Sequence, residues 1–139
     1  MPDPNCLFCK IAGGQAPAHV VGQNDHALAF LDVHPCAPGH TMVIPKTHVE
    51  KLSELPPDEI GPLFQLVSQV ATRLEEKLNA EGLTIGINQG EASHRGLAHL
   101  HVHLLSRYLN DQGGSVHTIV NNPPRENLEE MVEKLIINE

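Results

Sequence analysis

Histidines and aliphatic residues alternate in the segment 99–105, which reads HLHVHLL. In an extended strand, side chains at positions i, i+2 and i+4 lie on one face, spaced by roughly 6.5–7 Å. The pattern therefore predicts a strand with His99, His101 and His103 on one face and the aliphatic residues packed into a core. Imidazole is a nucleophile, an acid–base group and a metal ligand near neutral pH, so we expect the chemistry on this strand.

Charge, hydropathy and cysteine content exclude several classes of partner. The chain of 139 residues has a formal net charge of −8, whereas binding to nucleic acid requires a basic surface. No apolar run is long enough to span a membrane, so we expect neither nucleic acid nor membrane as a partner. Three cysteines do not form a disulfide framework, which favours a reducing cytoplasm. We expect one cytoplasmic domain over residues 1–139, the last part of it, 110–139, being a loop and helix.

Hydrophobic periodicity predicts an α+β fold. Apolar residues at i, i+3 and i+4 predict a long helix over 58–81, with Asp58 as its N-cap and Gly82 as its stop. A second amphipathic helix is expected at the C-terminus, after an irregular segment 110–124. The order of elements predicts an antiparallel sheet of about five strands with helices on one side. The expected strands are 20–23, 27–31, 41–44, 83–88 and 98–106.

Cys6 and Cys9 form a Cys-x-x-Cys pair, which can be interpreted as a redox pair or as half of a zinc site. A redox pair normally follows a strand, and no strand is predicted before this one. Half of a zinc site needs two further ligands, which the ten histidines could supply. Zinc is favoured, but the spacing alone leaves both possibilities open. Cys36, isolated beside a proline, is expected to be a small buried residue.

A catalytic zinc held by all three alternating histidines is a further alternative. The first and last rings of an unbent strand would lie roughly 13 Å apart, too far for three bonds near 2.1 Å. Separate roles for the three rings fit this geometry better. His34 and His40 flank a proline-rich turn and could line a site, but spacing alone does not assign them to one.

Two polar residues end predicted strands and are candidate ligand contacts. Asp32 could accept hydrogen bonds from sugar hydroxyls or simply cap its turn. Asn88 could donate to a phosphoryl oxygen. Gly90 and Gly96 bracket the next loop, which is flexible enough to present backbone N–H groups to an anion.

The pattern His-φ-His-φ-His-φ-φ at 99–105 resembles the motif of the histidine triad (HIT) nucleotide hydrolases and transferases. The segments 6–11, 29–32 and 38–48 resemble the N-terminal half of that family, and Asn88 precedes His99 by its usual eleven positions. The likeness extends over nearly the whole chain and is closest to Hint-like bacterial members. It implies a HIT-like fold and a two-fold homodimer, with the long helix as the expected contact element.

The resemblance also implies a reaction. His101 would attack the α-phosphorus of a purine nucleotide, a nucleoside phosphoramidate or a dinucleoside polyphosphate, and form a nucleotidyl-histidine intermediate. A non-catalytic purine-nucleotide sensor or partner-binding module on the same fold is the alternative. Substrate contacts would come from Asp32 at the ribose, Asn88 and His103 at phosphoryl oxygens, His94, Arg95 and Gly96 in the loop, and Phe8, Ile11 and Phe30 near the base.

In zinc-bearing bacterial members of the family, Cys6, Cys9, His48 and His99 would complete a closed, structural Cys2His2 site. The chemistry itself would require no cofactor. The sequence departs from the family where His94-Arg95 replaces the usual Gly-Gln. We expect this pair to add positive charge beside the phosphates and to favour longer polyphosphate leaving groups. The tryptophan common near the C-terminus is also absent, so the segment 110–124 is not expected to match.

Overall fold

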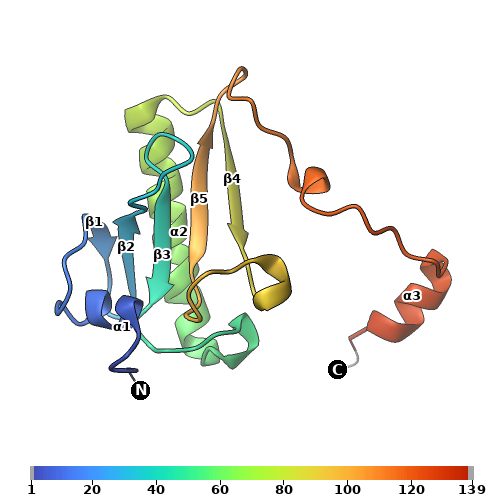
Figure 1. Cartoon of the computed structure of the whole chain (residues 1–139), viewed down its shortest axis with the longest axis horizontal. Helices are drawn as coiled ribbons and strands as arrows, with labels where there is room; N and C mark the ends of the chain where they lie inside the picture. Colours follow the sequence, from blue (N-terminus) through green and yellow to red (C-terminus); the bar gives the residue numbers. More distant parts are fainter. Residues whose placement is uncertain (1, 138–139) are drawn as a thin grey trace.

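The computed structural model describes residues 2–137 and shows a five-stranded antiparallel sheet with one long helix (Figure 1). The strand order is β1-β2-β3-β5-β4. The predicted α+β fold is therefore confirmed. The strands are β1 (Val20–Gln23), β2 (Ala27–Leu31), β3 (Thr41–Pro45), β4 (Gly82–Ile87) and β5 (Val102–Arg107), and the helices are α1 (Leu7–Ala12), α2 (Pro57–Leu78) and α3 (Leu128–Leu135).

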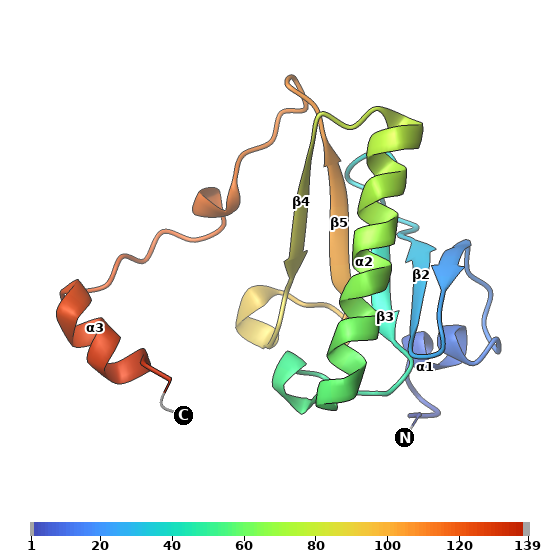
Figure 2. The ribbon, with the colours of Figure 1, turned by 180° about the vertical axis from the view of Figure 1, so that it is seen from behind.

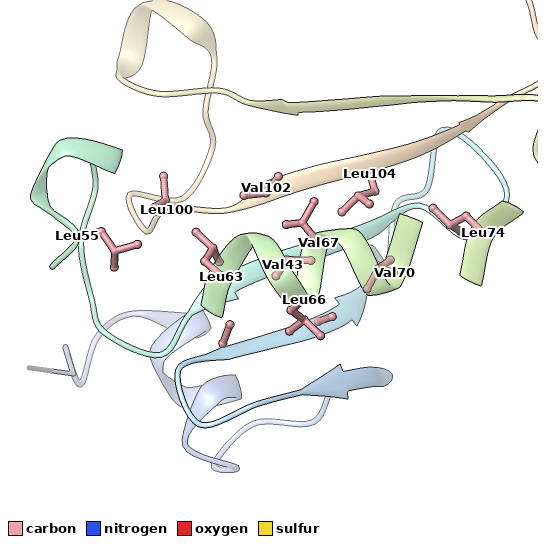
Figure 3. Packing of buried hydrophobic residues seen from close by; sticks show 12 residues of the cluster. Val43, Leu55, Leu63, Leu66, Val67, Val70, Leu74, Leu100, Val102 and Leu104 are labelled. Atoms are coloured by element: carbon pink, nitrogen blue, oxygen red, sulfur yellow. The ribbon is translucent and has the colours of Figure 1, made fainter. Parts of the chain in front are cut away.

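Helix α2 covers one face of the sheet and supplies five of the twelve buried residues of the main core (Figure 2). Its buried side chains recur at helical spacing and pack against β2, β3 and the aliphatic residues of the alternating segment (Figure 3). As predicted, the aliphatic positions 100, 102 and 104 all face this core. The cluster comprises Ala27, Ala29, Val43, Leu55, Leu63, Leu66, Val67, Val70, Leu74, Leu100, Val102 and Leu104.

Both predicted limits of the long helix are wrong. Helix α2 begins at Pro57, one residue before Asp58, because proline has the φ that a first helical position requires and no N–H to leave unpaired. The helix ends at Leu78, where Asn79 takes the left-handed conformation at φ 53°. Asparagine adopts this conformation more readily than most residues, so Gly82 is not the stop and instead begins β4.

The strand predicted over 98–106 is shorter than expected, while the other four lie within one residue of their predicted ranges. Only His103 of the three alternating histidines lies in β5, and His99 and His101 precede it. If the β3–β5 register continued, Pro45 would lie opposite Leu100. Proline has no N–H for the ladder, and the Leu100 N–H donates to the Val49 carbonyl at 2.7 Å instead.

The C-terminal arm, residues 108–137, leaves the sheet after β5 and runs beyond the edge strand β4 (Figures 1 and 2). Helix α3 within it has no buried residue. Among the described residues, no helix combines the length and the apolar character needed to cross a membrane.

Candidate functional site

The second face of the sheet carries the histidines and a smaller apolar cluster under α1. Phe8 packs edge-on against Phe30, with ring centroids 5.5 Å apart, and against His101 at 5.2 Å. Ile11 is 9% exposed and Phe30 only 3%. The three residues expected near a base therefore form one wall with the central histidine, although their contact with a base stays a prediction.

Four residues distant in sequence bring their ligand atoms together at the N-terminal helix. Cys6 is the N-cap of α1 and its Sγ accepts from the Cys9 N–H, so one helical turn sets both thiols on the same side. His48 follows β3, and His99 lies in the bend before β5. All four ligand atoms lie within 4.8 Å of one another.

The distances in this cluster fit one tetrahedral zinc ion. The Nδ1 of His99 lies 3.4 Å from the Cys6 Sγ, 3.5 Å from the Cys9 Sγ and 3.2 Å from the Nδ1 of His48. Bonds near 2.3 Å to sulfur and 2.05 Å to nitrogen give tetrahedral N–N and N–S edges of roughly 3.3–3.6 Å. Cysteine and histidine are the donors zinc prefers, so the four residues could hold it with no open coordination position.

Carbonyl oxygens fix the protonation of two rings in the triad. The Nε2–H of His99 donates to the Pro45 carbonyl at 2.9 Å, which leaves its Nδ1 unprotonated toward the cysteines. The Nδ1–H of His101 donates to the His99 carbonyl at 2.7 Å, which leaves a lone pair on Nε2. A carbonyl can only accept, so each neutral ring has one possible tautomer. The two histidines therefore present opposite nitrogens for different tasks.

His103 lies in a separate group with His40 and Asp32, the second set whose ligand atoms converge. The Cys36 N–H donates to the Nδ1 of His40 at 3.3 Å, so His40 carries its proton on Nε2. That Nε2–H donates to the Nδ1 of His103 at 2.9 Å. His103 is then left with a proton on its own Nε2, available for an acceptor on a ligand.

His40 is a site residue to which sequence reasoning assigned no role. It is 6% exposed, and its Nε2 also lies 3.5 Å from the Oδ2 of Asp32. The only sequence signal was a histidine entering a buried strand, which spacing could not connect to residue 103. Asp32 also accepts from the His34 N–H at 2.9 Å, so it caps its turn. Cys36, expected to be buried, is exposed because the turn places it at the surface.

Burial keeps the imidazole ring of His103 neutral. Desolvation is the main cause that lowers the pKa of His103 to about 4, and the neighbouring His101 and His40 lower it further. Burial also lowers the pKa of His40, and the charge of Asp32 offsets part of that effect. At neutral pH the pair therefore forms a neutral hydrogen-bonded chain.

This neutrality predicts a loss of stability in acid. Between pH 6.5 and about pH 4 the unfolded chain protonates His103 and the folded protein does not, so the free energy of unfolding falls as pH falls through this window. We expect His103→Asn to remove about 2 kcal/mol of the decrease between pH 7 and pH 4.5. Urea unfolding of both proteins at the two pH values measures it. Identical decreases would contradict the assignment.

The β4–β5 register ends where Ile87 pairs with Val102, so Asn88 follows β4 and His101 precedes β5 directly beyond this last pair. The loop that follows has left-handed backbone at Gly90, His94 and Gly96. Arg95 does not extend freely toward the triad, since its Nη2 lies 3.5 Å from the Glu50 Oε1. A phosphate that binds Arg95, as predicted from the sequence, would have to compete with the Glu50 carboxylate for its guanidinium.

The family model described as the HIT domain matches residues 13–110. An uncharacterized HIT-like protein of Methanocaldococcus jannaschii is 41% identical over 106 residues, covering 76% of this chain and 81% of that protein. A Zn-bound histidine triad family protein from Mycobacterium smegmatis has a crystal structure with a TM-score of 0.73 and 36% identity, covering 78% of each chain. Adenylylsulfatase HINT3 of Arabidopsis thaliana is 29% identical over 103 residues, which are 74% of this chain and 52% of that protein.

The family match covers more than half of the chain and includes the alternating histidines. The zinc-bound neighbour agrees with the donor set built by Cys6, Cys9, His48 and His99. The chain therefore belongs to the histidine triad (HIT) family.

Proposed function

We propose that this protein hydrolyses or transfers nucleotides at the α-phosphorus, with His101 as the nucleophile. The observation that carries the proposal is the 2.7 Å hydrogen bond from the Nδ1–H of His101 to the His99 carbonyl. It fixes the ring and leaves the Nε2 lone pair free for attack. HIT membership and the adenylylsulfatase relative support nucleotide hydrolase or transferase chemistry in general.

The reaction proceeds in two displacements. In the first, a bond forms between the Nε2 of His101 and the α-phosphorus, and the bond from phosphorus to the leaving amine or phosphate breaks. The leaving group takes up a proton from solvent. In the second, water attacks the phosphorus and gives up a proton to solvent, the nucleotidyl-histidine bond breaks, and nucleoside monophosphate and free His101 are released.

The surrounding residues stabilise the charge that develops on the phosphoryl oxygens. The Nε2–H of His103, held by His40, donates to one oxygen, and Asn88 donates to another. Backbone N–H groups of the loop residues 94–96 supply further donors. Asp32 binds the ribose hydroxyls with the lone pairs its turn leaves free, and Phe8, Ile11 and Phe30 form the apolar wall beside a purine base.

Zinc, when bound, supplies a structural link in this proposal. Cys6, Cys9, His48 and His99 would hold it, and all four are protein ligands that leave no position for water or substrate. These ligands would link the N-terminal helix and the loop after β3 to His99, two positions before His101. Such a link would orient the His99 carbonyl, which fixes the ring of His101. We further propose that the active species is a homodimer.

A covalent adduct tests the proposal. We expect mass spectrometry of the protein quenched during turnover of an adenosine phosphoramidate to show a nucleotidyl group on the peptide that contains His101. A slowly hydrolysed substrate favours its accumulation. Binding of adenosine monophosphate with no adduct and no turnover would overturn the catalytic proposal and favour a nucleotide sensor on the same fold.

Arg95→Gln is expected to change substrate preference rather than fold. The Arg95 guanidinium would leave Glu50 to bind a polyphosphate, and the variant removes this one charge-assisted contact. We therefore expect kcat/KM to fall about tenfold for a dinucleoside polyphosphate and to change little for a phosphoramidate. Steady-state kinetics on both substrates measure the ratio. Glu50→Gln is the matched control and should raise activity on the polyphosphate. An unchanged ratio in Arg95→Gln would remove Arg95 from leaving-group recognition.

A further inference from the structure

The loop 88–96 carries Asn88 and the backbone donors of residues 94–96 on which the proposed function relies. None of its residues is buried, so core packing does not fix its position. Bonds within the loop, such as the one from the Ser93 hydroxyl to the Gly90 carbonyl at 2.8 Å, set its shape. They do not attach it to the rest of the molecule. A loop that has to present donors at fixed points therefore needs an anchor on another segment.

One side chain ties the start of this loop to a segment distant in sequence. The Oε1 of Gln89 accepts from the Leu52 N–H at 2.8 Å, across 37 positions of the chain. Leu52 is the first residue of the short 3-10 helix Leu52–Glu54, so its N–H has no partner within that helix and is free for a side chain. Gln89 directly follows Asn88, and the bond therefore restrains the backbone that carries the Asn88 amide.

The segment that supplies this N–H is itself held in place. The Val49 carbonyl accepts from the Leu100 N–H at 2.7 Å, and the side chains of Val49 and Leu52 pack against the main core. The residues directly before the first pair, His48 and His99, bring their ring nitrogens together in the four-residue cluster described above. The Leu52 N–H is therefore a fixed point of the fold.

A second contact joins the loop to the same segment, but substrate competes for it. The Nη2 of Arg95 lies 3.5 Å from the Oε1 of Glu50, which is half exposed. A polyphosphate that draws the guanidinium away would break this ion pair. Among the hydrogen bonds and ion pairs of residues 2–137, the bond of Gln89 is then the one that still joins the loop 88–96 to the segment 48–52.

We propose that Gln89 is a positioning residue, whose bond to the Leu52 N–H holds the Asn88 amide in reach of a phosphoryl oxygen. The inference rests on the proposed function, which gives Asn88 its contact with substrate. Gln89 itself does not touch substrate. Negative charge on the phosphoryl oxygens is greatest in the transition state, so a displaced Asn88 weakens that state more than the bound substrate. Loss of the bond therefore lowers kcat and changes KM little.

Gln89→Met tests the role, because it keeps the length of the side chain and removes the acceptor oxygen. We expect kcat for an adenosine phosphoramidate to fall about fivefold, the order of one hydrogen bond, with KM within twofold of wild type. Gln65→Met makes the same change at an exposed position of α2 and should leave kcat within twofold. Wild-type kcat in Gln89→Met would overturn the positioning role alone, whereas a wild-type protein without turnover or adduct would overturn the proposed function and this inference with it.

The donor of the bond can be removed separately. Leu52→Pro has no N–H, and proline suits the first position of a helix after the extended Lys51, at ψ 145°. Leu52→Ala also loses apolar side chain but keeps the N–H. We expect Leu52→Pro to have a kcat about fivefold below that of Leu52→Ala, and Gln89→Met to lower kcat by less than twofold when it is added to Leu52→Pro, because the bond is already absent. A full fivefold further loss in that double variant would overturn the bond to Leu52 as the means of positioning.

Discussion

His101→Ala is expected to reduce turnover of an adenosine phosphoramidate by at least about a thousandfold, because the variant has no nitrogen to form the intermediate. Nucleotide binding should persist, since His103, Asn88 and Asp32 remain. Circular dichroism and the zinc content should match the wild type. Single-turnover kinetics with mass spectrometry of the quenched protein provide the measurement, and no nucleotidyl-protein should form.

The control for this change is His19→Ala, which removes an imidazole from an exposed position. It should leave turnover within twofold of wild type. His40→Ala adds a graded test, because it removes the donor that holds His103 while leaving the nucleophile in place. We expect a smaller loss, mainly in kcat, with the adduct still formed. Residual activity of a tenth or more in His101→Ala would remove His101 from its assigned role.

The double change Cys6→Ser with Cys9→Ser is expected to abolish zinc binding and to destabilise the fold. Elemental analysis should find close to one zinc per wild-type chain and almost none in the variant. The free energy of unfolding should fall by about 3–5 kcal/mol, because bound zinc would link α1 to the segment before β5 and the remaining histidines would be left buried without it. For a domain of this size, that corresponds to a decrease in Tm of roughly 10 °C or more.

Cys36→Ser is the matched control, because Cys36 is exposed and lies outside the four-residue cluster. It should retain zinc and melt within about 1 °C of wild type. Turnover in the double variant should fall as well, since the carbonyl that orients His101 belongs to the zinc ligand His99. A wild-type protein free of zinc, with an easily formed Cys6–Cys9 disulfide, would return the redox interpretation to first place.

The alternating segment 99–105 shows which structural features a local residue pattern predicts and which it does not. Period-two alternation predicted correctly that positions 100, 102 and 104 enter the core, because a buried face must be apolar whatever the backbone does at its ends. It wrongly extended the strand to His99 and His101. The strand ends where a proline on the neighbouring strand cannot continue the ladder, and that neighbour is known only from the sheet order.

The sequence by itself determined the fold class through hydrophobic periodicity and the family resemblance through motifs of fixed spacing, and that resemblance implied the four candidate zinc ligands. Only the tertiary structure decided what each ring faces. The carbonyl of His99 selects the reactive nitrogen of His101, and His40 holds His103 through a contact between residues 63 positions apart. The second bond joins distant segments, and the first depends on the backbone bend before β5, so no local pattern of residue types encodes either of them.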